Sequence, residues 1–453
     1  MIGNISLLLF SFIFICIIIM YFAKLQSDLD IIDIYIIFVL LHFGLYAFVR
    51  GLYFGKDAIF DFRDCNPLVI ASMFGQILLI LAIIRFMSWY FPKNIANYLN
   101  IKNLIQQYSR INKYILLCIY VVLIIFQIIS YYKYGVKTYI MQDDFERIGK
   151  HLPYWFTSFR TIYPHLAFLV FLGLFSRILK SKGYSQYVWI ILTLLFVPIV
   201  TIYGRRFFLA MIVVAVIFWF IEKRKNIFQL KYVKVSLVLV CGFFLFSNLF
   251  QAYREVFQAV GPVNLEKLKN PFKAAINFNA TIDNLKRRPG TWEFNFLVIN
   301  NQFSKPNMVT NGKITLEGFK SSIPRFFWAG KQFTIVDEIL ADLYHVKQSE
   351  IDIGKNLFGV AQVDYGYFSI LIVPIMILTV VVVMGLLIII TTQYPTFLWL
   401  FTGNILFFLI NIEENGNEVF FMVRYIIITL ILFAIYLVSH KIYLMLIRKS
   451  IDT

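Results

Sequence analysis

Charged residues are scarce in this chain, and their scarcity excludes most classes of soluble protein. Only 15% of its 453 residues are Asp, Glu, Lys or Arg, whereas 60% are hydrophobic. The apolar residues come in runs of helix length, and the mean hydropathy is +0.75. The chain has more apolar surface than a single soluble core can bury. The composition therefore predicts an all-α fold, a polytopic helical membrane protein.

Cysteine and acidic residues are also few. The four cysteines are scattered, which indicates neither a disulfide framework nor a zinc site. Lys and Arg outnumber Asp and Glu by 42 to 25, for a net charge of +17. Much of this positive charge lies in short loops beside apolar runs, as the positive-inside rule expects. We therefore expect no nucleic acid among the partners.

Motifs of several enzyme classes are missing as well. The chain has no P-loop, no dinucleotide-binding fingerprint, no metal-ligand spacing and no serine nucleophile elbow. Asp337, Glu338 and Asp342 lie close together, but the solvated face of a short helix explains them better than a metal site does. We expect no cofactor and no metal.

About eleven apolar runs, within a range of ten to twelve, are long enough to cross a membrane. They are expected at 2–23, 31–49, 67–86, 114–132, 161–176, 187–203, 207–221, 235–253, 367–390, 396–412 and 419–438. The first run lacks the basic start and cleavage site of a secretory signal, so we expect it to be retained.

The loop before the fourth run gives the orientation. It carries Lys93, Lys102, Arg110 and Lys113 without any acidic residue, which places it in the cytoplasm. Alternation from this loop puts the acidic residues of 413–418 outside and the C-terminus inside. Three regions are then expected, namely N-terminal transmembrane helices at 1–253, a large outer loop domain at 254–366, and C-terminal transmembrane helices with a cytoplasmic tail at 367–453.

The outer interval is polar but too rich in aromatic residues for disorder. We expect short, largely amphipathic helices lying against the bundle. At its centre, 321–331 combines aromatic and basic residues, and Pro324 and Gly330 predict a shaped loop there. Such a segment fits a place where lipid, glycan and phosphate meet.

Six cations near the outer face are candidates for binding an anionic substrate. They are Arg205, Arg206, Arg254, Arg325, Lys331 and Arg424. Guanidinium groups bind phosphate oxygens in bidentate fashion and stabilise charge on a leaving diphosphate, so the predicted substrate is a lipid diphosphate.

Arg424 is the most informative of these cations, because it falls inside the last apolar run. It should lie roughly 9 Å below the outer helix end, where an arginine needs a partner or a wet cavity. An ion pair with an acid of 413–418 explains it as well as a substrate does. For Arg205 and Arg206, a solvated turn at the lipid headgroups is the alternative.

A catalytic base is harder to name from the sequence. Asp364 and His345 are the main candidates, while Arg325 is expected to face the diphosphate. An exposed surface histidine explains His345 better than a catalytic base does. Asp364 could instead be a carboxylate favoured by the dipole at the start of a helix.

Several of these segments together resemble a known family. They are the Pro324-Arg325 pair, the Trp-Ala-Gly-Lys stretch at 328–331, and the Asp-Tyr-Gly-Tyr stretch at 364–367 before an apolar run. With many spans and one large outer loop late in the chain, they are similar to the Wzy-type O-antigen polymerases, the oligosaccharide repeat-unit polymerases of bacterial surface polysaccharides. The likeness covers most of the chain as architecture, but only the segments around Arg325 and Asp364 as sequence.

The resemblance implies a C-type glycosyltransferase-like membrane fold in the bacterial inner membrane, with its active site on the periplasmic face. The implied reaction transfers a growing glycan from undecaprenyl diphosphate to a new lipid-linked repeat unit. Lipid-linked donor and acceptor, membrane lipids and a chain-length regulator protein are the expected partners. The Arg-x10-Gly loop pattern of some members has no counterpart here, since Arg254 is followed by glycine at Gly261.

Two other functions fit parts of the pattern. An O-antigen ligase shares the architecture and the donor, and sequence alone separates it poorly from a polymerase. A flippase or transporter of lipid-linked repeat units would also be polytopic and basic, but such proteins usually show internal repeats and modest loops.

Overall fold

A computed structural model describes most of the chain. The described residues are 2–24, 29–52, 66–134, 153–201, 205–223, 291–305, 308–323, 327–328, 336–344, 356–390, 405–406, 408–410 and 415–451. Within these ranges the chain is helical and has no β-strand, apart from an isolated antiparallel bridge between Asp30 and Asn100. The predicted all-helical class is confirmed for this part of the chain.

The apolar runs within the described residues fold as helices, most of them close to the expected limits. They are α1 (Ile2–Lys24), α2 (Ile31–Leu52), α3 (Pro67–Ser88), α6 (Lys113–Tyr134), α8 (Tyr154–Lys180), α9 (Tyr184–Thr201), α10 (Arg205–Lys223), α18 (Ser369–Ile390) and α20 (Asn415–Ile451). The basic loop contains two further short helices, α4 (Lys93–Leu99) and α5 (Ile101–Arg110). The run expected at 235–253 lies outside the described residues, and 396–412 is described only at 405–406 and 408–410.

Five helical segments of the described chain are long and apolar enough to cross a membrane. They are Pro67–Ser88, Lys113–Tyr134, Tyr163–Lys180, Leu357–Ile390 and Met422–Ser439. Shorter apolar segments lie at Ile5–Met20, Ile31–Gly44, Tyr184–Phe196 and Met211–Glu222. By length and composition these segments suit a membrane protein. The count of about eleven spans stays a prediction.

Two helices exceed their predicted limits. Helix α8 begins at Tyr154, directly after Pro153, so residues 154–160, which precede the expected run at 161–176, form its first turns. Helix α20 includes residues 415–418 of the expected acidic loop and continues to Ile451. Hydropathy marks the part of a helix that suits lipid, whereas the helix itself continues through polar turns that satisfy the same backbone hydrogen bonds.

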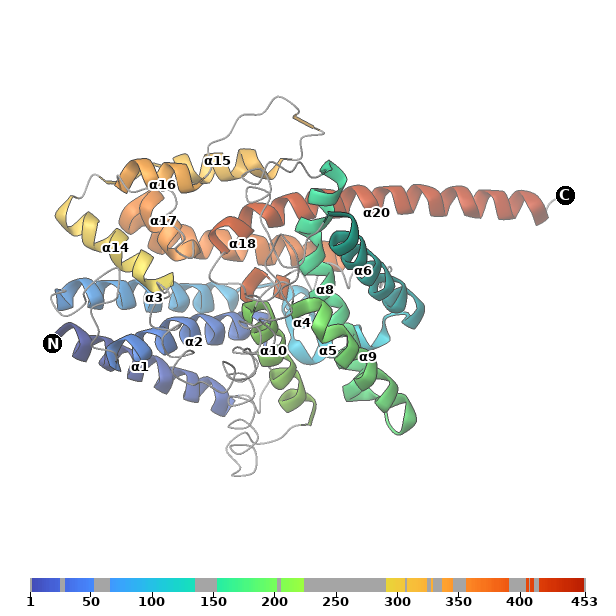
Figure 1. Cartoon of the computed structure of the whole chain (residues 1–453), viewed down its shortest axis with the longest axis horizontal. Helices are drawn as coiled ribbons and strands as arrows, with labels where there is room; N and C mark the ends of the chain where they lie inside the picture. Colours follow the sequence, from blue (N-terminus) through green and yellow to red (C-terminus); the bar gives the residue numbers. More distant parts are fainter. Residues whose placement is uncertain are drawn as a thin grey trace.

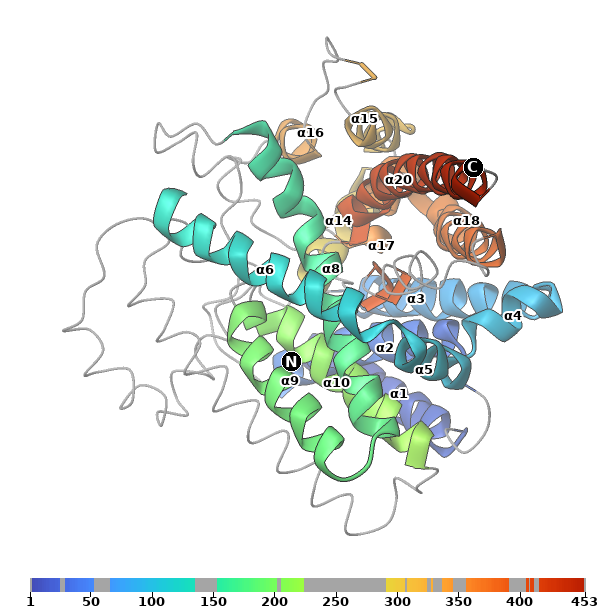
Figure 2. The same cartoon turned by 90° about the vertical axis from the view of Figure 1, so that its right-hand side faces the viewer.

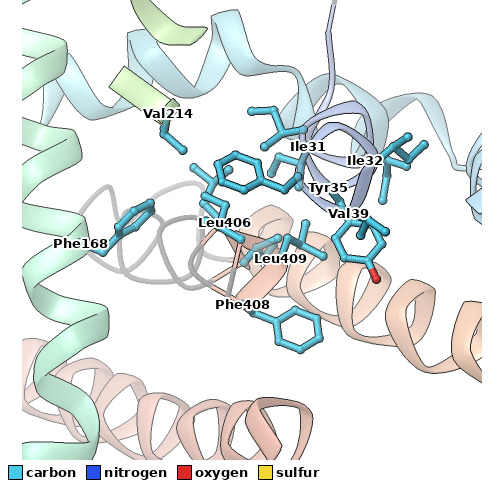
Figure 3. Close-up of a cluster of buried hydrophobic side chains, with 14 of the residues drawn as sticks. Ile31, Ile32, Tyr35, Val39, Phe168, Val214, Leu406, Phe408 and Leu409 are labelled. Atoms are coloured by element: carbon cyan, nitrogen blue, oxygen red, sulfur yellow. The ribbon is translucent and has the colours of Figure 1, made fainter. Parts of the chain in front are cut away.

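The long helices form two groups in space. Helices α1, α2, α3, α18 and the first part of α20 run lengthwise, while α6, α8, α9 and α10 cross them obliquely, and the C-terminal half of α20 projects beyond both groups (Figure 1). The core joins the groups. Figure 3 shows side chains of α2, α8 and α10 around Leu406 and Leu409, both of which are fully buried.

One end of the bundle gathers the basic loop and the connections predicted to be cytoplasmic. Asp30 and Asp33 cap the start of α2 reciprocally, and Arg85 at the end of α3 pairs with both carboxylates at 2.8 and 3.4 Å. Arg177 at the end of α8 donates to the carbonyl of Ile111, and Gly385 packs against Ile95. These contacts place the ends of α3, α8 and α18 on one side, as the predicted alternation requires.

The outer interval contains four short helices in its described part. They are α14 (Thr291–Ser304), α15 (Lys313–Ser322), α16 (Val336–Tyr344) and α17 (Leu357–Tyr365). Short helices were expected, but α17 differs from the amphipathic pattern because residues 357–364 are all buried. It leads through a 3-10 turn, η4 (Gly366–Phe368), into α18. Gly366 makes this break with φ 57°, a left-handed value that favours glycine.

Candidate functional site

Helix α15 is the centre of the candidate site, because it joins in space two segments that lie far apart in the chain. Its start contacts the end of α17, where Asp364 lies, and its end contacts α20 at Arg424. Immediately after α15 the chain enters the aromatic and basic segment that contains Arg325. Both segments on which the family resemblance rests therefore adjoin one short helix.

Asp364 caps the start of α15. The residue in the cap position is Gly312, which has φ 86° and no side chain to accept hydrogen bonds. The Asp364 carboxylate accepts bonds from the backbone N–H of Ile314 at 3.1 Å and of Thr315 at 2.8 Å. The hydroxyl groups of Thr310 and Thr315 donate to the same carboxylate. A buried anion with these partners satisfies the exposed N–H groups of the helix and complements its dipole.

Arg424 binds the opposite end of α15. Its guanidinium donates from Nε to the carbonyl of Ser322 at 3.3 Å, and from Nη2 to the carbonyl of Ser321. A cation at the C-terminus of a helix complements the negative end of the dipole. Sequence reasoning proposed an acid or a substrate as the partner of Arg424, whereas the structure adds backbone carbonyls of the outer interval.

The side of α15 is fixed as well as its ends. A Cβ atom at Gly318 would lie 2.4 Å from Cε2 of Phe420, so glycine permits the close approach of α15 to α20. Glu317, which is 9% exposed, pairs with Lys320 at 2.6 Å. The helix is therefore held by α17 at its start, by α20 along its side and by Arg424 at its end.

A network of buried amides supports α17 beneath the site. Asn356 caps α17 through Gly359 N–H and donates to Asn295 of α14 at 2.8 Å. Gln362 donates to Gln302 of α14 at 2.7 Å and accepts from the Ser369 hydroxyl at 2.6 Å. The burial of these amides is tolerated because each of them forms hydrogen bonds with a protein partner.

A small cavity lies beside this network, between α3, α14, α17 and α18. Its volume is about 10 Å³, room for about one water molecule. Gln76, Asn295, Gln362 and Ser369 supply its polar lining, together with apolar residues such as Phe358. A glycan or a diphosphate is far too large for this space, so the cavity belongs to the packing of α17.

Only part of the predicted site can be placed. Asp364 and Arg424 are brought to one helix, as described above. Arg205 and Arg206 form the first turn of α10, where a turn between helices was expected, and their side chains lie outside the described residues. Arg254, Arg325, Lys331 and His345 also lie outside the described residues, so their predicted roles stay predictions.

The geometry sets conditions on the catalytic role of Asp364. The residue is fully buried, and both of its carboxylate oxygens accept hydrogen bonds from α15 or Thr310. As a base it would have to give up part of this cap when it takes a proton. Sequence reasoning considered a carboxylate at the start of its own helix, whereas Asp364 lies at the end of α17 and caps α15.

Two acidic side chains of α16 are described. Glu338 and Asp342 are exposed on that helix. Within the described ranges, no group of three or more His, Cys, Asp or Glu side chains is placed to hold a metal.

Sequence reasoning did not single out His165, which is 4% exposed inside α8. Its ring lies beside that of Tyr425, with centroids 5.4 Å apart, next in the chain to Arg424. An ionisable residue inside an apolar run was the available signal. Asp33 and Arg85 carry the same signal within or beside their runs, and they form the ion pair at the other end of the bundle.

Comparisons with protein-family models, with curated proteins and with solved structures found no match to this chain.

Proposed function

We propose that this chain polymerises undecaprenyl-diphosphate-linked oligosaccharide repeat units into a bacterial surface polysaccharide such as O antigen. The reaction is a glycosyl transfer, independent of metal, from the lipid-linked growing chain to a new lipid-linked unit. It takes place on the periplasmic face of the inner membrane. The observation that carries the proposal is the position of α15, which adjoins both segments that resemble the polymerase family.

The contacts of Arg424 support a shared role for the arginines. Arg424 holds the carbonyls of Ser321 and Ser322, and Arg325 follows only a few residues later in the chain. The segment containing Arg325 and Lys331 thus begins at the end of α15 that Arg424 binds. A diphosphate needs a cluster of cations, because its charge grows as the bond between the anomeric carbon of the sugar and the diphosphate oxygen breaks.

The proposed step divides the work between cations and a base. Arginine side chains of the cluster hold the diphosphate of the donor, and a base removes a proton from the attacking sugar hydroxyl as the new glycosidic bond forms. Asp364 and His345 are the candidates for that base. The diphosphate leaves with the lipid, so the balance requires no metal and no nucleotide.

The lipid-linked glycans of a deletion strain test this function. Loss of a polymerase leaves single repeat units on lipopolysaccharide, loss of a ligase leaves lipopolysaccharide uncapped, and loss of a flippase strands units on the cytoplasmic leaflet. We expect single-unit caps, restored to a ladder by the wild-type gene. Either of the other patterns would contradict the proposal.

Substitutions in the complementing gene test the diphosphate site. Arg254→Ala, Arg325→Ala and Arg424→Ala should each shorten the polymer more than they lower protein level, since a charge-assisted contact contributes about 1.5–3 kcal/mol. Arg448→Ala, in the predicted cytoplasmic tail, is the matched control. Unchanged ladders in all three variants would refute the diphosphate cluster.

The alternative of a lipid-linked repeat-unit transporter has one observation in its favour. Helices α17 and α18 form a broken helix, with its break at Gly366, and broken helices often line substrate sites in transporters. Accumulation of lipid-linked repeat units on the cytoplasmic leaflet of the deletion strain would favour this function over polymerisation.

A further inference from the structure

The outward face of α15 is apolar. Leu316 is 56% exposed and Phe319 is 52% exposed, although both side chains are large and hydrophobic. The opposite face of the helix, which includes Ile314, Gly318 and Ser322, is buried. Lys313 is exposed one turn before Leu316, near the start of the helix.

The contacts of α15 prevent this face from turning inward. Asp364 holds the start of the helix, Arg424 holds its end, and Gly318 lies against the ring of Phe420. Rotation about the helix axis would break all of these contacts at once. The exposure of Leu316 and Phe319 is therefore fixed by the way the helix docks.

The position of α15 beside α20 favours contact of this face with lipid. The helix lies along the first part of α20 at the periphery of the bundle, and both run lengthwise, like α3 and α18 (Figure 1, Figure 2). Its residues Gly318 and Ser322 contact Phe420 and Arg424. Arg424 lies inside the apolar segment Met422–Ser439. The end of α15 thus reaches the depth at which α20 becomes apolar.

The hydrogen bonds at the end of α15 also suit an environment without water. Carbonyl groups at a helix C-terminus usually bind solvent, but in hydrocarbon they need protein donors. Ser321 and Ser322 donate their hydroxyls, at 2.6 Å, to the carbonyls of Gly318 and Phe319. Arg424 donates to the carbonyls of Ser321 and Ser322 themselves. Side chains therefore donate hydrogen bonds to these carbonyls near the end of the helix.

We propose that α15 dips into the membrane beside α20, with Leu316 and Phe319 in contact with phospholipid acyl chains. Lys313 then lies at the level of the lipid phosphates, which attract its ammonium group. Tyr367, Phe368 and Leu371, where α18 begins, are also exposed. The turn before them adjoins the start of α15, because Gly312 packs on Tyr365 and Gly366 on Val309. This inference does not depend on the catalytic function.

Spin-label accessibility in vesicles tests the proposal. Single cysteines at Lys313, Leu316 and Phe319 are introduced into the full chain after its native cysteines are replaced. Each is labelled with a nitroxide and reconstituted into phosphatidylcholine–phosphatidylglycerol vesicles. Collisions with oxygen, which concentrates in lipid, are compared with collisions with a water-soluble nickel complex. Labels at Leu371 on α18 and Lys102 on α5 are the references for lipid and for water.

We expect the oxygen-to-nickel ratio to rise from Lys313 to Leu316 to Phe319 and to approach the Leu371 value. The depth should increase by about 9 Å over these six residues. Ratios equal to that of Lys102 would place the face in water and overturn the proposal. Protection from both reagents would also overturn it, because another protein surface would then cover the face. If the label at Phe319 disturbs folding, the Leu316 label supplies the same comparison.

Discussion

Asp364 and Arg424 hold opposite ends of the same ten-residue helix, α15, although they lie on different helices of the bundle. The carboxylate meets the positive end of the helix dipole, and the guanidinium meets the negative end. Each charge thus has a structural partner whether or not it also binds substrate. Substitutions at either position must therefore be scored for stability as well as for activity.

The first prediction concerns the cap at the start of α15. Asp364→Ala should lower the stability of the detergent-solubilised protein by about 2 kcal/mol, the upper end for a helix cap. Thr315→Val removes one hydroxyl donor to the same carboxylate, so it should cost about 1 kcal/mol. Thermal unfolding measures both.

A polymer assay on the same variants separates the two roles of Asp364. If it acts only as a cap, both variants should lose polymer in proportion to the folded protein that remains. If Asp364 acts as the base, Asp364→Ala should make no polymer at all, even at a protein level at which Thr315→Val is still active. Wild-type thermal stability in both variants would rule out the cap as described.

A second prediction uses the close contact between α15 and α20. Gly318→Ala should lower stability by about 1–3 kcal/mol, because the new methyl group overlaps the Phe420 ring. Gly75→Ala on α3 is the matched control, since a Cβ atom there meets nothing within 4 Å. Phe420→Leu should partly restore the Gly318→Ala variant. Equal melting temperatures for Gly318→Ala and Gly75→Ala would count against this packing.

The third prediction concerns the ion pair at the other end of the bundle. Arg85→Met should lower stability by about 3–5 kcal/mol, because the fully buried Asp33 carboxylate loses its nearest cation. Adding Asp33→Asn should restore most of this loss, since the double variant no longer buries an uncompensated charge. Chemical or thermal unfolding of the two single variants and the double variant gives the coupling. Additive effects would mean that Arg85 does not compensate Asp33.

A fourth prediction tests the orientation of the chain. In a variant without native cysteines, Lys102→Cys should react with a membrane-impermeant thiol reagent only from the cytoplasmic side. Asn415→Cys, at the start of α20, should react only from the periplasmic side. The reason is that the acid-free basic loop favours the cytoplasm. Labelling of Asn415→Cys from the cytoplasmic side alone would contradict the predicted topology.

The last prediction separates a substrate-facing role of 321–331 from simple anchoring. Arg325→Lys should shorten the polymer, because a point charge replaces a bidentate fork, while Trp328→Phe should have a mild effect. Trp328 is 43% exposed, as either role requires. A silent Arg325→Lys together with a destabilising Trp328→Phe would make the segment an anchor and move the site towards Arg205, Arg206 and Arg424.

The sequence alone determined the class of fold and most of the helices. Apolar runs of membrane length are a local property, so α1, α2, α3, α6, α9 and α18 begin and end close to their expected limits. Charge imbalance is also local, and it predicts the orientation of the chain, which stays a prediction. Pro153 and the polar turns of α20 extend helices beyond their apolar segments, which hydropathy does not detect.

Only the tertiary structure decided what the charged residues contact. The sequence identified Asp364 and Arg424 as informative, but neither position carries a signal that names α15 as the partner. Those hydrogen bonds join residues about fifty and about a hundred positions apart, and they depend on how α17 and α20 pack. The burial of α17 is likewise a tertiary result, because Asn356 and Gln362 can be buried only where the amides of α14 form hydrogen bonds with them.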